Sequence, residues 1–376
     1  MVINFPKGQL IPEDSNQKSN PYYHLLLKAP PETLREKFFS LTNARANARD
    51  VAKLLNVEYR RLVYHIYKVP PEKRYKTFEL PKKSGGTRQI STPQTALKII
   101  QWKLNQVLQT VYAPKPSAHG FVASKNIVTN AQAHSKKRYI LNLDLKDFFP
   151  SINFGRVRGM FIATPYGLTP EVATVLAQIC CHNNQLPQGA PTSPIITNMI
   201  CAKMDSQLQR LAKACKATYT RYADDITFST TLKGFPESLA KVVTEEGEEK
   251  IILGEPLLGI IADNGFQVNE NKIRLQTKGN HQEVTGLTAN KFPNVDRRFI
   301  RQVRAMLHAW AKFGLEAAER EFQEKYATKS RLPSKGTPNF KEVLRGKIEF
   351  IGIVKGKENE IYSKFIDKFN ILSKIN

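Results

Sequence analysis

The chain has 376 residues, with 57 Lys and Arg against 33 Asp and Glu, so its formal net charge is +24. This excess of positive charge indicates a polyanionic partner and is typical of proteins that bind nucleic acids. A hydrophobic fraction of 41% over this length predicts two or three packed units with large cores and excludes a disordered basic tail.

Neither a membrane segment nor a secretion signal is predicted. No run of about 18 apolar residues occurs, and the N-terminal residues 1–6 are too short and polar for a signal peptide. The sequence therefore predicts a cytoplasmic protein without membrane contact. Its cysteines lack C-x-x-C spacing, so we expect reduced core thiols and no zinc site or disulfide. They are Cys180, Cys181, Cys201 and Cys215.

Helices and one hairpin are predicted in the first third of the chain. Residues 1–32 are rich in Pro, Asn and Lys and lack periodicity, which predicts an extended arm. From residue 31 to about 68, the apolar spacing predicts two amphipathic helices that pack and do not read DNA. Residues 78–93 predict two strands joined by a basic, glycine-containing turn, and a helix with a buried stripe follows over 97–111.

The segment Tyr139–Leu145 predicts a buried strand whose polar face carries an acid. Its residues alternate with period two, so the three leucines share one face while Asn142 and Asp144 share the other. The strand is followed by Phe148-Phe149-Pro150, in which the proline prevents continuation and the two aromatic residues form a wall beside the acid.

Two more carboxylates lie at the tip of a predicted hairpin. The run Thr218–Ser229 alternates and turns tightly at Tyr222-Ala-Asp-Asp225, which places Asp224 and Asp225 together. Such a tip is either a solvated acidic turn or a set of oxygen ligands for a hard divalent cation. With Asp144 on a neighbouring strand, the pattern favours two-metal nucleotidyl transfer, in which the cations lie about 3.5–4 Å apart.

Further elements are predicted after this hairpin. A helix is expected from about Pro236 to Phe266, with the like-charged run Glu245–Glu249 as a solvated break between its two pieces. Asn269–Lys272 then leads into another strand. No internal repeat occurs at the periods typical of solenoid proteins, so a repeat architecture is not supported.

The last ninety residues are strongly basic, and their clearest element is a helix from Arg297 to Lys312. Its apolar seam consists of Phe299, Val303, Met306, Trp310 and Phe313, and Gly314 is placed to end it. Outside the seam lie Arg297, Arg298, Arg301 and Arg304. These cations are either simply solvated or grip the phosphates of a duplex without reading its sequence, and the global charge favours the grip.

Three motifs in this order resemble those of reverse transcriptases. They are Asp144 with its Phe-Phe-Pro, Leu186-Pro-Gln-Gly-Ala-Pro-Thr-Ser-Pro194, and Tyr222-Ala-Asp-Asp225. Two further segments resemble elements of the retron reverse transcriptases: Asn130-Ala-Gln-Ala-His134 resembles their N-A-x-x-H, and Val284-Thr-Gly286 resembles their V-T-G. The resemblance extends from about Leu34 to the end of the chain.

The resemblance implies an α+β right-hand polymerase fold, with an antiparallel palm sheet flanked by helices and a helical, basic thumb. On this basis we expect an N-terminal arm over 1–32, fingers over 33–138, a palm over 139–289 with a fingers insertion near 154–187, and a thumb over 290–376.

The resemblance also implies roles for individual residues. Asp144, Asp224 and Asp225, with the Leu145 carbonyl, would bind two Mg²⁺ ions, which Mn²⁺ can replace. The nucleotide pocket would contain Lys82 or Lys83 with Arg88, the gate Phe149 that excludes a 2′-OH, Gln188 and Gly189. Lys272 would protonate pyrophosphate. Nucleic acid would contact Tyr222, Val284, Thr285, Gly286, Arg297, Arg301 and Arg304. Asn130 and His134, four apart on a helix, would either contact RNA or pack on the palm.

A retron enzyme implies particular partners. These are dNTPs, a cognate non-coding RNA that is both template and 2′-OH primer, the branched RNA–DNA product called msDNA, and a separate effector or toxin protein in anti-phage defence. The alternatives are another bacterial reverse transcriptase, of intron, diversity-generating or abortive-infection type, and an RNA-binding scaffold that restrains a toxin. The N-A-x-x-H and V-T-G elements argue against the first, and the intact acids with Gln188 and Arg88 argue against the second.

Overall fold

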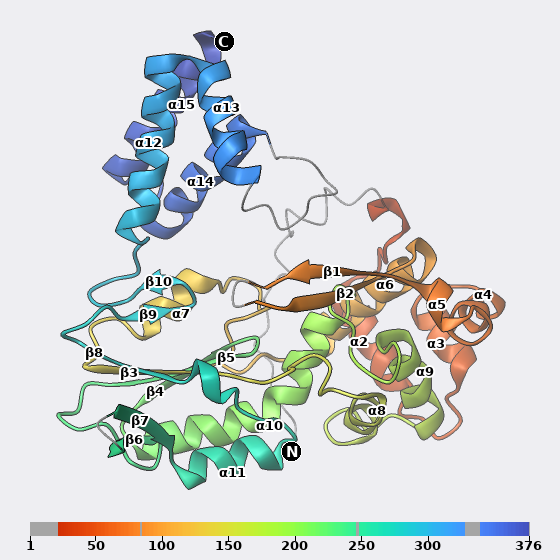
Figure 1. The fold of residues 1–376 in the computed structure, drawn as a ribbon. Coiled ribbons are helices and arrows are strands. Elements are labelled where there is room, and N and C mark those ends of the chain that lie inside the picture. The colour runs from red at the N-terminus through yellow and green to blue at the C-terminus, as the bar shows by residue number, and fades with distance from the viewer. Residues whose placement is uncertain (1–21, 83–84, 246–247, 328–338, 376) are drawn as a thin grey trace.

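The structure of the chain is a computed structural model that describes residues 22–82, 85–245, 248–327 and 339–375. Figure 1 shows three parts: a helical part on one side, a central antiparallel sheet, and a helical bundle above the sheet. Helices and antiparallel strands are therefore largely segregated, and the predicted α+β class is confirmed.

The helical part combines the N-terminal elements with a later insertion. The N-terminal elements are η1 (Tyr23–Leu25), α2 (Pro31–Ser40), α3 (Ala48–Leu54), α4 (Tyr59–Val63), the π-helical turn η2 (Tyr64–Lys68), α5 (Pro71–Arg74) and α6 (Thr95–Val111). The insertion contributes α8 (Phe154–Ile162) and α9 (Pro170–Cys180), and α9 packs on α3 and α6. Prolines open α2 and α9 at a position where the missing N–H costs no hydrogen bond.

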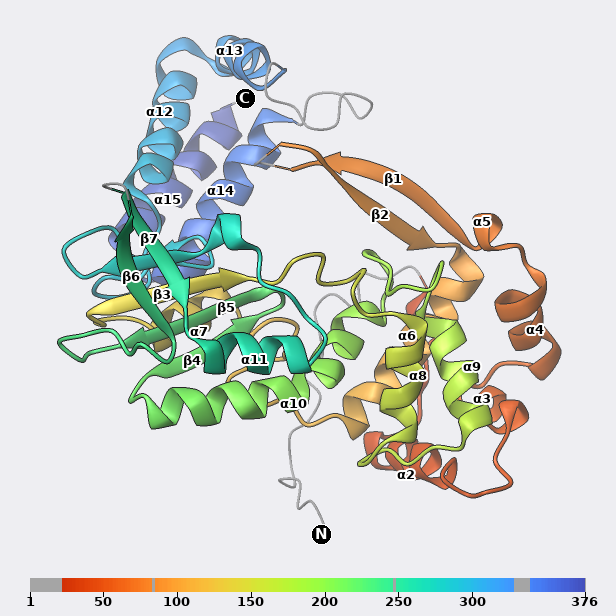
Figure 2. The same cartoon turned by 60° about the horizontal axis from the view of Figure 1, so that its bottom comes forward.

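A long hairpin extends from this helical part toward the bundle (Figure 2). It consists of β1 (Tyr75–Pro81) and β2 (Thr87–Pro93), which pair antiparallel with Phe78 opposite Ile90. The two strands and the following α6 lie where the sequence predicts them. Lys83 lies outside the described residues.

The central sheet has four antiparallel strands in the order β4-β5-β3-β8. They are β3 (Tyr139–Asp144), β4 (Thr218–Tyr222), β5 (Asp225–Thr230) and β8 (Arg274–Thr277). Helices α10 (Ser193–Ala214) and α11 (Glu255–Asp263) lie below the sheet in Figure 1. Above it lie α7 (Ile127–Ala133) and the short hairpin of β9 (Glu283–Val284) and β10 (Leu287–Thr288).

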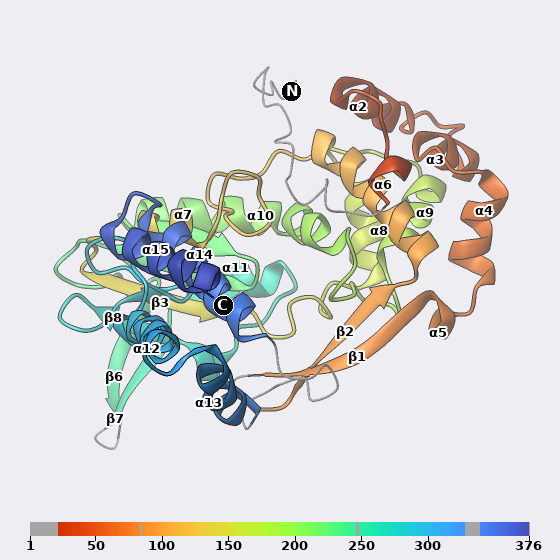
Figure 3. The same ribbon diagram turned by 90° about the horizontal axis from the view of Figure 1, so that it is seen from above.

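The bundle consists of α12 (Arg297–Phe313), α13 (Leu315–Ala327), α14 (Phe340–Lys355) and α15 (Glu360–Ile375), which Figure 3 shows from above. Helix α12 begins where the Asp296 side chain accepts a hydrogen bond from the Arg298 N–H, and it ends at Gly314, whose φ of 80° favours glycine. The predicted seam is wrong at one position, because Phe313 is 61% exposed and Leu307 is buried instead.

Two apolar cores hold these parts together. The larger core extends from the N-terminal helices to the sheet and contains the fully buried Phe161 and Phe228. The smaller core fills the bundle around Trp310 and also includes Ile140 of β3 and Val284 of β9. The bundle therefore shares its core with the region around the sheet.

The helix predicted from Pro236 to Phe266 is wrong over its first half. Residues there form the two-stranded ribbon β6 (Ala240–Glu245) and β7 (Glu248–Leu253), and only α11 is helical. Val242, Val243, Ile251 and Ile252 explain the difference, because β-branched side chains favour a strand.

Three of the four cysteines are buried in the core, as the sequence predicts, and Cys215 is only partly buried. All four cysteines are free, and burial raises the pKa of the Cys181 and Cys201 thiols to about 12. Among the described helices, none is both long and apolar enough to cross a membrane.

Candidate active site

Strand pairing brings the three predicted acids to one edge of the central sheet. Asp144 ends β3 and lies opposite Asp225, which begins β5. The Leu145 N–H donates a hydrogen bond to the Asp224 carbonyl at 3.0 Å, which ties the two chain segments together just beyond this pair. Asp144, Asp224 and Asp225 are called the acidic edge below.

Crowding of like charges changes the protonation of the acidic edge. Burial, and next the charge of Asp144, raises the pKa of Asp224 above its usual value. Burial, followed by the charges of Asp224 and Asp144, raises the pKa of Asp225 to about 7. The cluster therefore ionises fully only when positive charge compensates it.

Lys272 supplies part of this positive charge. It ends the 3₁₀ turn η3 (Glu270–Lys272), and its Nζ lies 2.9 Å from both carboxylate oxygens of Asp144. The turn is held in place because the Asn269 N–H donates to the Asp144 carbonyl at 2.8 Å. Such a two-oxygen contact is charge-assisted and stronger than a neutral hydrogen bond.

The acidic edge fits a divalent cation that also binds substrate phosphates. In the described parts of the chain, no group of three or more His, Cys, Asp or Glu side chains could enclose a metal ion by itself. Mg²⁺ does not need such a cage, because it usually takes one or two carboxylates and completes its shell with phosphates and water. The raised pKa of Asp225 is a second sign of fit, since a cation would offset both the burial and the repulsion that cause it.

A cavity of about 540 Å³ opens beside the acidic edge. Among the residues that line it are Asp144, Asp225, Tyr222, Lys272, Thr285 and Gly286. The structure therefore brings two predicted metal ligands together with three predicted nucleic-acid contacts from separate segments. Thr285 and Gly286 form the turn between β9 and β10, with φ of 46° and 80°.

The predicted nucleotide residues lie where the long hairpin meets the loop before α10. The Ser91 N–H of β2 donates to the Gln188 carbonyl at 2.8 Å, and a Cβ at Gly189 would lie 3.1 Å from the Ser91 carbonyl oxygen. Arg88 of β2 is close enough to the acidic edge for its charge to oppose the rise in the pKa of Asp224. Phe149 is half-buried and packs against the buried Phe148, with ring centroids 5.4 Å apart.

A fully buried ion pair supports the acid-bearing turn, and the sequence gives little sign of it. The Arg221 guanidinium donates to both Asp205 oxygens at 2.8 Å, and both side chains are 0% exposed. A further nitrogen of Arg221 donates to the Ala223 carbonyl at 3.0 Å, inside the turn itself. The single available signal is Arg221 itself, a charged residue within the predicted strand that ends at the acids.

The segment just before α7 is fastened to the same turn. The Arg221 N–H donates to the Ser117 carbonyl at 2.9 Å, and the His119 N–H donates to the Arg221 carbonyl at 2.8 Å. A Cβ at Gly120 would lie 2.5 Å from the Ala223 nitrogen, so only glycine fits at this position. Asn198 also holds the segment, because its Nδ2 donates to the Gly120 carbonyl at 2.9 Å.

Three predicted nucleic-acid contacts are corrected by their burial. His134 is 0% exposed, and its ring nitrogens lie 2.7 Å from the hydroxyls of Ser229 and Thr220. Burial lowers the pKa of His134 to about 3, so the ring is neutral and braces strands β4 and β5. Asn130 is 1% exposed and contacts Thr285 at 3.5 Å, and Val284 is 0% exposed within the apolar core. Burial therefore favours the packing alternative for Asn130 and His134.

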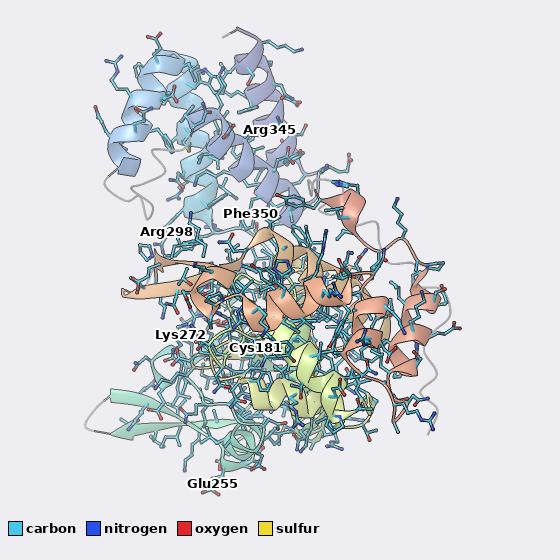
Figure 4. The ribbon with its side chains drawn as sticks, turned by 90° about the vertical axis from the view of Figure 1, so that its right-hand side faces the viewer. Cys181, Glu255, Lys272, Arg298, Arg345 and Phe350 are labelled. Carbon is cyan, nitrogen blue, oxygen red and sulfur yellow. The ribbon has the colours of Figure 1, made fainter. Side chains whose placement is uncertain are left out.

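The predicted cations of the bundle are on its surface. Arg297, Arg301 and Arg304 are all exposed along α12, as the sequence predicts. Figure 4 places the neighbouring Arg298 at the end of the bundle nearest to the central sheet.

Comparison with known proteins agrees with these observations. The family described as "Reverse transcriptase (RNA-dependent DNA polymerase)" matches residues 80–289. The chain is 37% identical to Retron Mx65 reverse transcriptase and 35% identical to Retron Mx162 reverse transcriptase, both of Myxococcus xanthus. Each alignment covers 70% of this chain, and they cover 62% and 60% of those two proteins, so this chain spans about three fifths of their length.

The alignment with a third relative covers similar shares of both chains. Retron Ec86 reverse transcriptase of Escherichia coli is 33% identical over 257 residues, which are 68% of this chain and 71% of that protein. The family match covers the central sheet with α6 and the α8–α9 insertion, which is consistent with the right-hand polymerase fold. The chain therefore belongs to the reverse transcriptase family and, within it, to the retron reverse transcriptases.

Proposed function

We propose that this chain is the RNA-directed DNA polymerase of a retron. The observation that carries the proposal is the acidic edge, where Asp144 and Asp225 of two paired strands line a cavity that also receives Tyr222 and the Thr285–Gly286 turn, with Asp224 next to Asp225 in the adjoining turn. Acids at this spacing suit nucleotidyl transfer, and the surrounding cations suit a polyanionic template and product.

We also propose the assignment of the parts. The arm covers residues 1–32, the fingers 33–138, the palm 139–289 with a fingers insertion near 154–187, and the thumb 290–376. Support for the insertion comes from the packing of α9 on α3 and α6. Leu27, although in the arm, is bound to α6, because its N–H donates to the Gln106 side chain at 2.9 Å.

In this proposal the protein's own residues position the reactants. Asp144, Asp224 and Asp225, with the Leu145 carbonyl, hold two Mg²⁺ ions, or Mn²⁺ in their place. When bound, the metal activates the attacking hydroxyl and stabilises the leaving pyrophosphate. Lys272, which contacts Asp144 in this structure, would protonate the leaving pyrophosphate.

The remaining contacts bind the nucleotide and exclude ribonucleotides. Arg88, with Lys82 or Lys83, neutralises the triphosphate, while Gln188 and Gly189 shape the pocket. Phe149 blocks a 2′-OH by its bulk. Replacing Phe149 by Ala should therefore admit ribonucleotides while deoxynucleotide use falls much less, which single-nucleotide incorporation with each class measures. If discrimination does not change, Phe148 becomes the candidate for the gate.

The partners follow from the retron relatives. We propose that a cognate non-coding RNA supplies both template and 2′-OH primer, and that the branched RNA–DNA product stays bound. A separate effector or toxin protein in anti-phage defence and a location in the bacterial cytoplasm belong to the same proposal. Its support is the similarity to three retron reverse transcriptases.

The test is to purify the protein from its host and to sequence the nucleic acid bound to it. A discrete RNA–DNA species with a 2′–5′ branch is expected, and the Asp224→Asn, Asp225→Asn double variant should retain the RNA without the DNA. Linear complementary DNA of an intron or of a variable repeat would favour another reverse transcriptase type. Bound RNA without DNA in the unaltered protein would favour the scaffold.

A further inference from the structure

A row of aromatic rings passes beside the acidic edge. Phe266 and Phe148 lie with centroids 5.6 Å apart, Phe148 and Phe149 are 5.4 Å apart, and Phe149 and Phe121 are 6.5 Å apart. The last two pairs are edge-to-face, with interplanar angles of 75° and 62°. Aromatic pairs prefer this geometry, so each ring restricts the tilt of the next.

The rings differ in how firmly they are held. Phe148 and Phe266 are each 3% exposed and are fixed by the core. Phe149 is half-buried and Phe121 is 47% exposed, so packing alone restrains neither of them fully. Phe149 therefore depends on a support on its open side, and Phe121 is the ring that stands there.

Phe121 is held in place by its backbone instead of by burial. Its φ is 60°, a left-handed conformation that is unusual for a bulky residue and persists only where the surroundings impose it. The preceding residue, Gly120, lies against the Ala223 nitrogen, and its carbonyl accepts a hydrogen bond from Asn198. The backbone that carries Phe121 is therefore part of the same unit as the acid-bearing turn.

We propose that Phe121 is a positioning residue for sugar selection: its ring fixes the orientation of Phe149, so discrimination against ribonucleotides depends on both side chains. The inference rests on the proposed polymerase function and on Phe149 as the gate. A left-handed backbone is costly for a phenylalanine, and here it places the ring against the half-buried Phe149.

The experiment compares single-nucleotide incorporation of dNTP and rNTP with Mg²⁺ on a primed RNA template. We expect Phe121→Ala to lower the dNTP-to-rNTP ratio of kcat/KM by roughly threefold to tenfold, the effect of losing one aromatic pair. The change should appear mainly as a lower KM for rNTP. Phe121→Tyr, which keeps the ring, should restore the ratio, and Phe121→Leu should fall between the two.

A double variant tests whether Phe121 acts through Phe149. If it does, Phe121→Ala combined with Phe149→Ala should discriminate no worse than Phe149→Ala alone. Independent, multiplying effects would overturn the proposal, as would an unchanged ratio in a folded Phe121→Ala or Phe121→Leu protein. Phe313→Ala, which removes an exposed phenylalanine at the far end of α12, is the matched control. Failure of the unaltered protein to incorporate dNTP would overturn the polymerase function itself.

Discussion

The acidic edge and the C-terminal bundle hold their charges in opposite ways. Behind the acidic edge, Arg221 and Asp205 are completely buried and are joined by two hydrogen bonds of 2.8 Å. On the bundle, Arg298 is 92% exposed and lies 4.0 Å from Asp296, at the limit of an ion pair. The comparison teaches that chemistry at phosphorus depends on the position of a few groups, whereas holding a duplex depends on how many cations face it.

The sharpest test of this difference removes charge from the acidic edge. Asp224→Asn with Asp225→Asn should reduce primer extension by at least about a thousandfold, because metal stabilisation of the transition state is lost. RNA binding, measured by filter retention, should stay within about twofold of the unaltered protein because the cations of the bundle remain. Residual synthesis near the original rate would show that other groups bind the metal.

The buried pair should be the most sensitive structural contact near the acids. Asp205→Asn leaves the Arg221 charge buried without its partner, which we expect to destabilise the protein by about 3–5 kcal/mol. The urea midpoint measures this, and Lys53→Gln at the exposed Lys53–Asp50 pair is the matched control, with an expected change under about 0.5 kcal/mol.

Replacing both Arg221 and Asp205 tests whether the pair contributes to catalysis as well as to stability. Arg221→Met with Asp205→Leu should recover much of the stability, because no unpaired charge is left in the interior. Synthesis should stay impaired, since the Ala223 carbonyl still lacks its donor. Full recovery of synthesis in the double variant would mean that the pair serves packing alone.

On the bundle, duplex affinity should fall gradually with the number of arginines that are replaced. Replacing Arg297, Arg301 and Arg304 by Gln should weaken duplex binding on every sequence and reduce the slope of log affinity against log salt by up to about 2.7. The fold should survive, as checked by circular dichroism, because Val303 and Trp310 keep the core. An unchanged slope would mean that other cations contact the duplex, for example those of the basic stretch Lys341–Lys357.

The smallest effect expected is a pH dependence at the acidic edge. The pKa of Asp225 is about 7 in the folded chain against 3.8 for an ordinary Asp, so the folded protein holds a proton that the unfolded chain releases. Stability should therefore fall as pH rises from about 4 to about 7. Neighbouring groups desolvate the Asp225 carboxylate, but its residue still has surface in contact with solvent, so screening reduces the effect. In EDTA at pH 8, Asp225→Asn should therefore be more stable by only on the order of 1 kcal/mol.

The Asp225→Asn variant also tests whether repulsion between the carboxylates causes the loss of stability at high pH. At pH 4 the two proteins should melt alike, because Asp225 is protonated and as neutral as Asn. Added Mg²⁺ should stabilise the unaltered protein at pH 8 and remove the advantage of the variant. Equal melting at both pH values would mean that the carboxylates do not repel each other in the free protein.

Motifs and periodicity predict much of this structure. Alternation over Tyr139–Leu145 and the tight turn at Tyr222–Asp225 are sufficient to place the acids on paired strands, and helical spacing is sufficient to place α6 and α12. Both signals are local, so a single sequence contains them. The ribbon β6–β7 was wrongly predicted because its charged residues obscure the strand preference of its valines and isoleucines.

Contacts between distant segments are what the sequence could not reveal. Arg221 meets Asp205 across 16 residues and Ser117 across more than a hundred, and no local pattern encodes either contact. His134 illustrates the same limit, because its position on a helix allows an RNA contact or a packing contact equally. Only the fold shows that Ser229 and Thr220 enclose its ring.

The core that the bundle shares with the sheet region restricts how this protein can be shortened. Ile140, Val284 and Leu287 are each 0% exposed and belong to the same apolar core as the bundle side chains. A chain cut at residue 289 would leave these apolar surfaces in water and should aggregate when it is expressed. Soluble fragments for crystallisation or enzyme engineering must therefore keep the four C-terminal helices, even when only the polymerising half is wanted.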